Sequence, residues 1–84
     1  MIVRIFGSTN CHSCLESMAL IKKVGLYLVY VDAFDDDEKV QQLCDKYDVD
    51  DLPHIQFINN KGEIIIEHKG PILYGQLKQY LINL

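Results

Sequence analysis

The sequence predicts an α/β fold whose elements follow the order β-α-β-α-β-β-α, with a four-stranded mixed sheet flanked by three helices. Two observations support this prediction. Short runs rich in β-branched and aromatic residues alternate with runs of helical period, and turn-forming residues separate the last two strand-like runs as in a hairpin. At 84 residues, 49% of them apolar, the chain suits a single domain over residues 1–84 with one modest core.

The first part of the chain predicts a strand, a helix and a second strand. Met1–Phe6 is an apolar run that predicts a strand, and turn residues follow it. A helix is expected from about Cys11 to Val24, because Gly25 is a residue that commonly ends helices. Leu26–Asp32 has the composition of a buried strand. This order favours a parallel strand pair with a right-handed crossover.

An acidic run at residues 35–38 comes next. Such a run can bind a cation, but carboxylates at the first turn of a helix also complement the helix dipole, and we favour this second interpretation. The helix that follows has one apolar face at i, i+3, i+4 and i+7, made of Val40, Leu43, Cys44 and Tyr47. On this face Cys44 is expected to be a small buried core residue and not a third redox thiol.

The second half predicts a hairpin and a final helix. His54–Ile58 and Glu63–His68 are the two strands, with Ile55 and Phe57 on one face of the sheet. The helix is expected to begin at Gly70-Pro71, since proline favours the first helical position. Its buried stripe would consist of Leu73, Leu77, Tyr80, Leu81 and Leu84.

Composition and charge exclude some classes of function and partner. The formal net charge is −4 and only Lys22-Lys23 are adjacent basic residues, which argues against nucleic-acid binding and favours basic or neutral protein partners. No apolar stretch is long enough to cross a bilayer, and no secretory signal is found at the N-terminus. We therefore expect a cytoplasmic protein without a membrane partner. In that compartment a pair of cysteines two residues apart is more often catalytic or metal-binding than structural.

Cys11 and Cys14 form such a pair at the start of the first predicted helix. A thiol there faces unpaired backbone N–H groups and the positive end of the helix dipole, which stabilise the reactive thiolate. Cys11 is therefore predicted to be the nucleophile. Cys14, one turn into the helix and more buried, is predicted to be its resolving partner. His12 and Ser13 lie between them as candidate tuning residues.

The chain has three histidines. A protonated His12 would favour the Cys11 thiolate and make the pair more oxidising, whereas a solvated side chain would have no effect. His54 could approach the cysteines from the side of Pro53, or it could simply begin the strand and cover the edge of the site. His68 is expected at the surface of the return strand.

A Cys-x-x-Cys motif after the first strand and a single proline before the third are the pattern of the thioredoxin fold. The sequence resembles the thioredoxin and glutaredoxin superfamily over essentially its whole length. Its shorter front begins directly at the strand before the motif, as in glutaredoxins. The strongest stretches lie in the second half: Tyr47–Val49, Leu52-Pro53, Ile55, Phe57, Gly62-Glu63, Gly70 and Gln76–Leu81.

This resemblance implies a dithiol–disulfide oxidoreductase that reduces protein disulfides. Pro53 should follow a cis peptide bond beside the cysteines, exposing the Leu52 backbone to an extended substrate, with His54 next to it. The protein would need no cofactor, because the Cys11–Cys14 disulfide is itself the redox-active group. A reductase or glutathione would supply the electrons, and we expect a monomer.

Some positions depart from the resemblance. Ile5 stands where thioredoxins keep a buried acid, and Asp50 and Asp51 place negative charge where the glutathione carboxylates would bind.

Two alternatives stay open. In the first, the Cys11 and Cys14 thiols bind a metal or a cluster, although they supply only two of the four ligands that a structural zinc site needs. In the second, the chain is a non-enzymatic module that binds peptides beside Pro53.

Overall fold

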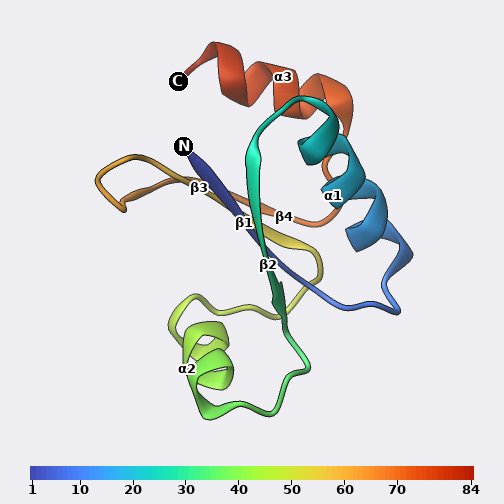
Figure 1. Ribbon diagram of the computed structural model, residues 1–84, viewed down its shortest axis with the longest axis vertical. Coiled ribbons are helices and arrows are strands. Elements are labelled where there is room, and N and C mark those ends of the chain that lie inside the picture. The colour runs from blue at the N-terminus through green and yellow to red at the C-terminus, as the bar shows by residue number, and fades with distance from the viewer.

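The computed structural model describes residues 1–84 and has the predicted order of elements (Figure 1). None of its helices combines the length and the apolar character that a membrane-spanning helix requires. The elements, in chain order, are β1 (Ile2–Gly7), α1 (His12–Lys23), β2 (Tyr27–Asp32), α2 (Glu38–Lys46), β3 (His54–Ile58), β4 (Ile64–Lys69) and α3 (Tyr74–Ile82).

The four strands form one mixed sheet in the order β2-β1-β3-β4. The β1–β2 pair is parallel, and Gly7 lies beside Asp32. The β1–β3 and β3–β4 pairs are antiparallel, and Phe6 lies beside His54. The ends of β1 and β2 and the start of β3 therefore meet at one end of the sheet. The cysteine motif follows β1 at this end.

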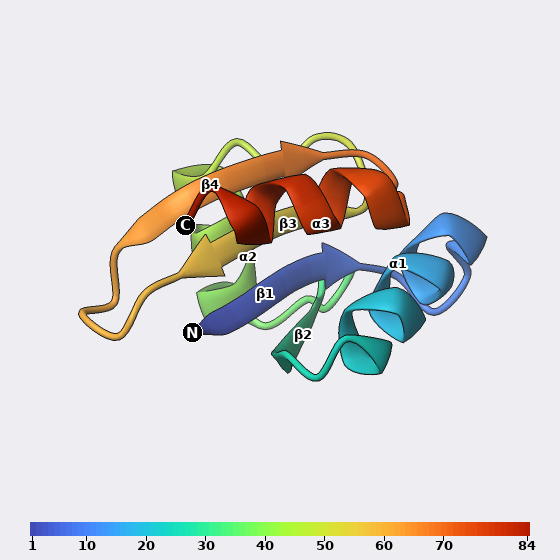
Figure 2. The same cartoon turned by 90° about the horizontal axis from the view of Figure 1, so that it is seen from above.

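One face of the sheet carries the apolar core. Helices α1 and α3 pack on this face, and Figure 2 shows α3 in front of the strands with α2 behind them. Ile55 and Phe57 of β3 lie together on this face, as predicted, because every second side chain of a strand points the same way. The core consists of Val3, Ile5, Ile21, Ile55, Phe57, Ile72 and Leu77.

The opposite face is more polar and has α2 on its side (Figure 1). The Phe6 ring lies 6.4 Å from the Tyr47 ring at the end of α2. The acidic run begins this helix as predicted, because Asp37 Oδ1 accepts a hydrogen bond from the Lys39 N–H at 2.8 Å. Residues 32–51, which contain α2, hold nine of the twelve acidic residues of the chain. One part of the surface is thus strongly acidic.

The last helix begins at Tyr74 and not at Pro71, so that prediction was wrong. Other groups hold the residues before the helix in place. The Pro71 carbonyl accepts a hydrogen bond from His68 Nε2 at 3.0 Å, and the Ile72 N–H donates to the buried Ser17 Oγ at 3.2 Å. These hydrogen bonds hold Pro71 and Ile72 outside the helix, so that the first helical turn begins at Tyr74.

This later start also changes the buried stripe of α3. Leu77 is buried as predicted, but Leu73 and Leu84 are 67% and 53% exposed, so their expected burial was wrong. His68 was expected at the surface and is instead partly buried. Its Nδ1 accepts a hydrogen bond from the Tyr80 hydroxyl at 2.8 Å, which ties β4 to α3.

Candidate active site at the start of α1

Cys11 and Cys14 form a disulfide at the N-terminus of α1, with their Cα atoms 5.2 Å apart. Cys11 is the N-cap residue, and its Sγ accepts a hydrogen bond from the Cys14 N–H at 3.2 Å. Cys11 is partly exposed, whereas Cys14 is fully buried. This difference confirms that Cys14 is the more buried of the two sulfurs. Only the Cys11 sulfur is open to an incoming group.

The surroundings of Cys11 favour negative charge on its sulfur. The helix N-terminus presents unpaired N–H groups to it, and one of them already donates to the sulfur. The Ser13 Oγ lies 3.4 Å from the same Sγ and can donate a second hydrogen bond. Ser13 is therefore placed where it can stabilise a Cys11 thiolate.

His12 points along the helix toward Glu16. Its Nε2 lies 2.9 Å from the Glu16 carboxylate, and the two side chains are 88% and 68% exposed. The Glu16 carboxylate therefore holds the imidazole at the surface, one turn away from the start of the helix. The structure brings His12 to Glu16 and not to either sulfur.

Gly7, the last residue of β1, has no side chain beside the buried Cys14. A Cβ atom added to Gly7 would lie 3.1 Å from Cys14 Cβ and 3.2 Å from its Sγ, and 3.5 Å from Tyr30 Cε1. The lack of a side chain at Gly7 thus leaves a small space that both the Cys14 sulfur and the Tyr30 ring border. Sequence reasoning missed Tyr30. The strand pattern could have indicated it, because Tyr30 lies beside Ile5 on the α1 face of the sheet.

Pro53 follows a cis peptide bond, as the resemblance implied. It is buried, and its carbonyl accepts a hydrogen bond from the Gly70 N–H at 2.8 Å. Leu52 is partly exposed in front of it. Both residues lie at the start of β3, at the end of the sheet where the cysteine motif follows β1.

His54 faces away from the cysteines. It lies beside Phe6, whose ring it contacts edge-on at 5.7 Å, on the face opposite to that of Gly7 and Cys14. The imidazole is fully buried and its Nε2 donates to Glu67 Oε2 at 2.7 Å, while Nδ1 is buried without a partner. Its side chain is thus part of the polar face of the sheet and does not reach the disulfide.

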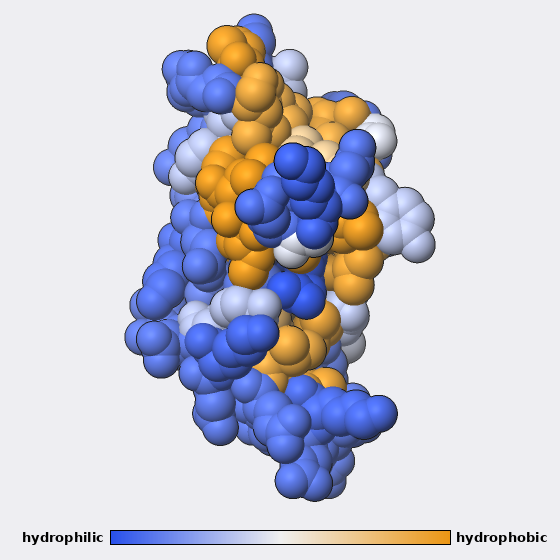
Figure 3. Space-filling model, turned by 90° about the vertical axis from the view of Figure 1, so that its left-hand side faces the viewer, coloured by the Kyte–Doolittle hydropathy of each residue, from blue (hydrophilic) through white to orange (hydrophobic).

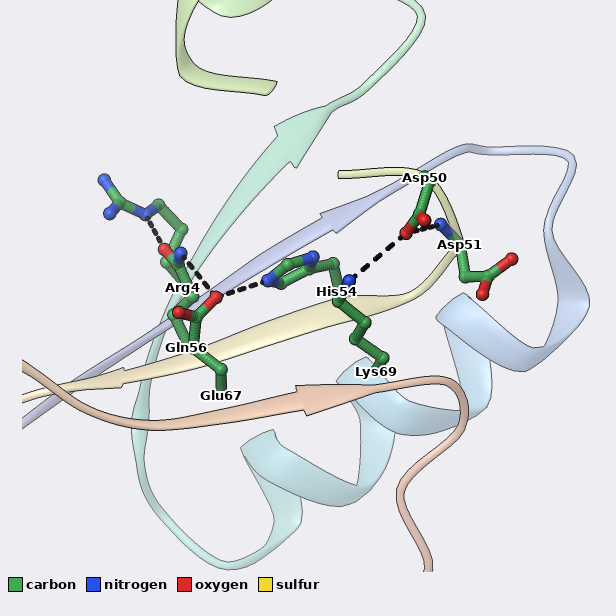
Figure 4. A network of polar contacts seen from close by, with 7 residues as sticks. All are labelled: Arg4, Asp50, Asp51, His54, Gln56, Glu67 and Lys69. Carbon is green, nitrogen blue, oxygen red and sulfur yellow. Dashed lines mark hydrogen bonds and ion pairs between the residues drawn. The ribbon is translucent and has the colours of Figure 1, made fainter. Parts of the chain in front are cut away.

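A network of hydrogen bonds continues from His54 across this face (Figure 4). Gln56 Nε2 donates to the same Glu67 oxygen at 3.3 Å, and Arg4 Nε donates to Gln56 Oε1 at 2.8 Å. The hydrogen bond from His54 is the main cause that lowers the pKa of Glu67. We call Arg4, His54, Gln56 and Glu67 the polar-face network.

Cys44 is a free thiol that is 9% exposed, as expected for a small buried residue. Burial, and secondarily the charge of Asp45, raise its pKa. It lines an open hollow of about 520 Å³ together with acidic side chains and Lys69. Nowhere in the chain do three or more His, Cys, Asp or Glu side chains gather in a way that could hold a metal ion.

No protein-family model and no curated protein sequence matches the chain. Solved structures do. Thioredoxin O2 from Arabidopsis thaliana in its oxidized state is 22% identical, with a TM-score of 0.77, and the match covers 99% of this chain and 73% of that one. The germline-specific thioredoxin Deadhead from Drosophila melanogaster is 20% identical, with a TM-score of 0.76 and coverage of 99% and 79%.

A third structure, described as a malarial protein, is 25% identical, with a TM-score of 0.73 and coverage of 98% and 93%. These matches extend over almost the whole of this chain. The chain therefore has the thioredoxin fold and is thioredoxin-like in structure, as the sequence resemblance predicted.

Proposed function

We propose that this thioredoxin-fold chain is a dithiol–disulfide oxidoreductase that reduces the disulfides of other proteins through Cys11 and Cys14. The observation that carries the proposal is the asymmetry of the pair. One sulfur caps a helix and is accessible, and the other is fully buried one turn further on. An accessible stabilised thiolate can attack a foreign disulfide, and a buried neighbour can then displace it.

The reaction begins with the reduced pair. The Cys11 thiolate attacks one sulfur of the substrate disulfide, which forms a mixed disulfide and releases the other substrate sulfur as a thiolate. Cys14 then attacks Cys11, the bond between Cys11 and the substrate breaks, and the substrate leaves fully reduced. The resulting Cys11–Cys14 disulfide is the state that the structure shows. An external reductase or glutathione must reduce it again.

Two features support a protein as the substrate. The Leu52 backbone before the buried Pro53 lies at the same end of the sheet as the motif, where an extended peptide can pair with it. The acidic segment 32–51 would favour neutral or basic segments of that partner.

Reduction of insulin disulfides by serine variants tests the proposal. We expect Cys11→Ser to abolish turnover, because it removes the nucleophile. Cys14→Ser should accumulate mixed disulfides that mass spectrometry detects, because it removes only the resolving sulfur. Cys44→Ser is the matched control and should keep full activity. Unchanged insulin reduction in both Cys11→Ser and Cys14→Ser would show that the proposal is wrong.

The reduction potential of the pair separates the possible roles. Equilibration in graded thiol–disulfide buffers, followed by counting free thiols by mass, gives this value. A midpoint near about −270 mV indicates a thioredoxin-like reductant, and one near about −200 mV a glutaredoxin-like or more oxidising role. A pair that never closes, or that purifies with a bound metal, would favour the metal-binding alternative.

A further inference from the structure

We propose that this chain self-associates head to tail, with the exposed Phe34 of one copy inserted into an apolar groove between α1 and α3 of a second copy. Two surfaces of the molecule are complementary in this way, one by its apolar walls and positive rim and the other by its aromatic tip and negative flanks. Neither surface contains Cys11 or Cys14, so the contact is independent of the proposed oxidoreductase function.

The groove lies where the end of α1 meets α3. Two hollows of about 310 and 400 Å³ adjoin there and share Val24 and Tyr74. A cavity of about 150 Å³ is enough to hold a benzene ring, so either hollow has room for one aromatic side chain. The walls are mostly apolar side chains of the two helices, and the only charged lining residues are Lys23 and Lys78. We call this surface the lysine groove.

The two lysines of the groove have no acidic partner within the chain. The three ion pairs of the structure involve His12, His54 and Lys69, and none includes Lys23 or Lys78. Apolar anchors with charged rims are typical of protein–protein contacts, and opposite charges at the rim select the partner. The lysine groove therefore fits an apolar side chain that is flanked by carboxylates.

The loop before α2 has this composition. Phe34 is 75% exposed, more than any other large hydrophobic residue of the chain, and residues 32–38 around it contain five carboxylates. None of these carboxylates forms an ion pair. Burial of an aromatic ring stabilises a contact through the apolar area that it removes from water. We call residues 32–38 the Phe34 loop.

Hydrogen bonds hold the Phe34 loop in one shape. Asp32 Oδ1 accepts a hydrogen bond from the Phe34 N–H at 3.0 Å, and the Asp32 carbonyl accepts one from the Asp35 N–H at 3.1 Å. From α2, Gln41 Nε2 donates to the Asp35 carbonyl at 2.6 Å. A loop that is already ordered loses little conformational entropy when its tip is buried by a partner.

The two surfaces cannot meet within one chain. Figure 1 shows the Phe34 loop, between β2 and α2, at one end of the long axis, and α3 with the end of α1 toward the other. This axis extends over 35 Å. The contact therefore needs a second copy and joins two different patches, which makes it heterologous. One aromatic anchor and a few charges form a small interface, so the association is weak and the monomer is the dilute state.

Sedimentation equilibrium at protein concentrations up to about 1 mM tests the proposal. We expect the average mass to rise above the 9.7 kDa of one chain. Phe34→Ala and Lys78→Glu should each raise the dissociation constant about tenfold or more. Both residues are exposed, so neither change should disturb the fold, which circular dichroism checks. Non-reducing electrophoresis identifies copies that are joined by a disulfide.

Tyr27→Ala and Lys61→Glu are the matched controls. They remove an exposed aromatic ring and reverse an exposed charge at positions outside both surfaces, and they should leave the association unchanged. Lys61→Glu changes the net charge by the same amount as Lys78→Glu, so it separates a local effect from general repulsion. Equal weakening by a control and its matched variant would show that the inference is wrong.

A mixture of the two variants identifies the contact itself. Phe34→Ala keeps the lysine groove and Lys78→Glu keeps the Phe34 loop, so an equimolar mixture should associate at a concentration at which neither variant does so alone. A native chain that stays monomeric at about 1 mM would overturn the inference. So would association that both variants leave unchanged, or a mixture that stays monomeric.

Discussion

The two faces of the sheet bury their residues in different ways. On the α1 and α3 face, the core consists of aliphatic and aromatic side chains that pack against one another, and His68 of β4 is hydrogen-bonded to Tyr80 of α3 beside it. On the α2 face, His54 and Gln56 are as fully buried as Phe57, yet they are polar and are held by hydrogen bonds to Glu67 and Arg4. Figure 3 shows the hydrophilic surface over the lower part of one side, where α2 lies. Residues are thus equally buried on both faces, but apolar packing stabilises one face and hydrogen bonds between side chains stabilise the other.

The largest expected effect comes from the packed face. Phe57 is fully buried between Tyr80 and the rest of the core. Phe57→Ala should lower the free energy of unfolding by about 3–5 kcal/mol, because it removes buried area and leaves a cavity. Urea unfolding measures this loss. Ile65→Ala, at a residue of β4 that is 42% exposed, is the control and should cost much less. Similar losses in both variants would contradict the comparison.

A smaller effect is expected on the paired face. Gln56→Leu keeps a side chain of similar size but removes the acceptor of Arg4 Nε and a donor to Glu67. We expect a loss of about 1–3 kcal/mol, because Arg4 and Glu67 each lose a partly buried hydrogen bond to the fully buried Gln56 side chain. Urea unfolding again provides the measurement, with the exposed Gln79→Leu as its control. A Gln56→Leu variant as stable as the native chain would show that this face is stabilised by packing after all.

The packed face was predictable from the sequence and the paired face was not. The alternation in β3 places Ile55 and Phe57 on one face of the sheet, and both are fully buried there. By the same pattern Gln56 belongs at the surface. Its burial depends on Arg4 and Glu67, which lie 52 and 11 residues away in the chain. No local pattern encodes such partners.

The candidate site divides in the same way. The motif predicted the reactive pair Cys11 and Cys14, and the resemblance implied a cis peptide bond before Pro53. The structure contains both the Cys11–Cys14 disulfide and this cis bond. The pairing of His12 with Glu16 depends on side-chain orientation. The position of Tyr30 on the α1 face depends on the register of two strands. Sequence patterns specify the reactive atoms better than their neighbours.

The pH dependence of stability sharpens the comparison further. Hydrogen bonding from His54 lowers the pKa of Glu67 in the folded chain. A lowered carboxyl pKa adds stability above the unfolded-state pKa, and this stability is lost as the pH falls through the folded-state pKa. Glu67→Gln should therefore lose stability near neutral pH and show a flatter acid limb. Urea unfolding between about pH 7 and pH 3 gives both curves. Parallel curves would mean that Glu67 does not contribute through its charge.

The smallest effect is expected beside the network, at Asp50 and Lys69. Their ion pair spans 3.4 Å and the two side chains are 71% and 49% exposed, and the charge of Lys69 is the main cause that lowers the pKa of Asp50. Solvent and salt screen such exposed pairs, so Asp50→Asn should leave the urea midpoint unchanged at about 0.15 M salt and lower it only slightly at low salt. A loss as large as that of Gln56→Leu would mean that exposed charges stabilise this face. The expected contrast between the two variants would instead show that burial of the hydrogen-bonded groups, and not the number of charges, makes the polar face stable.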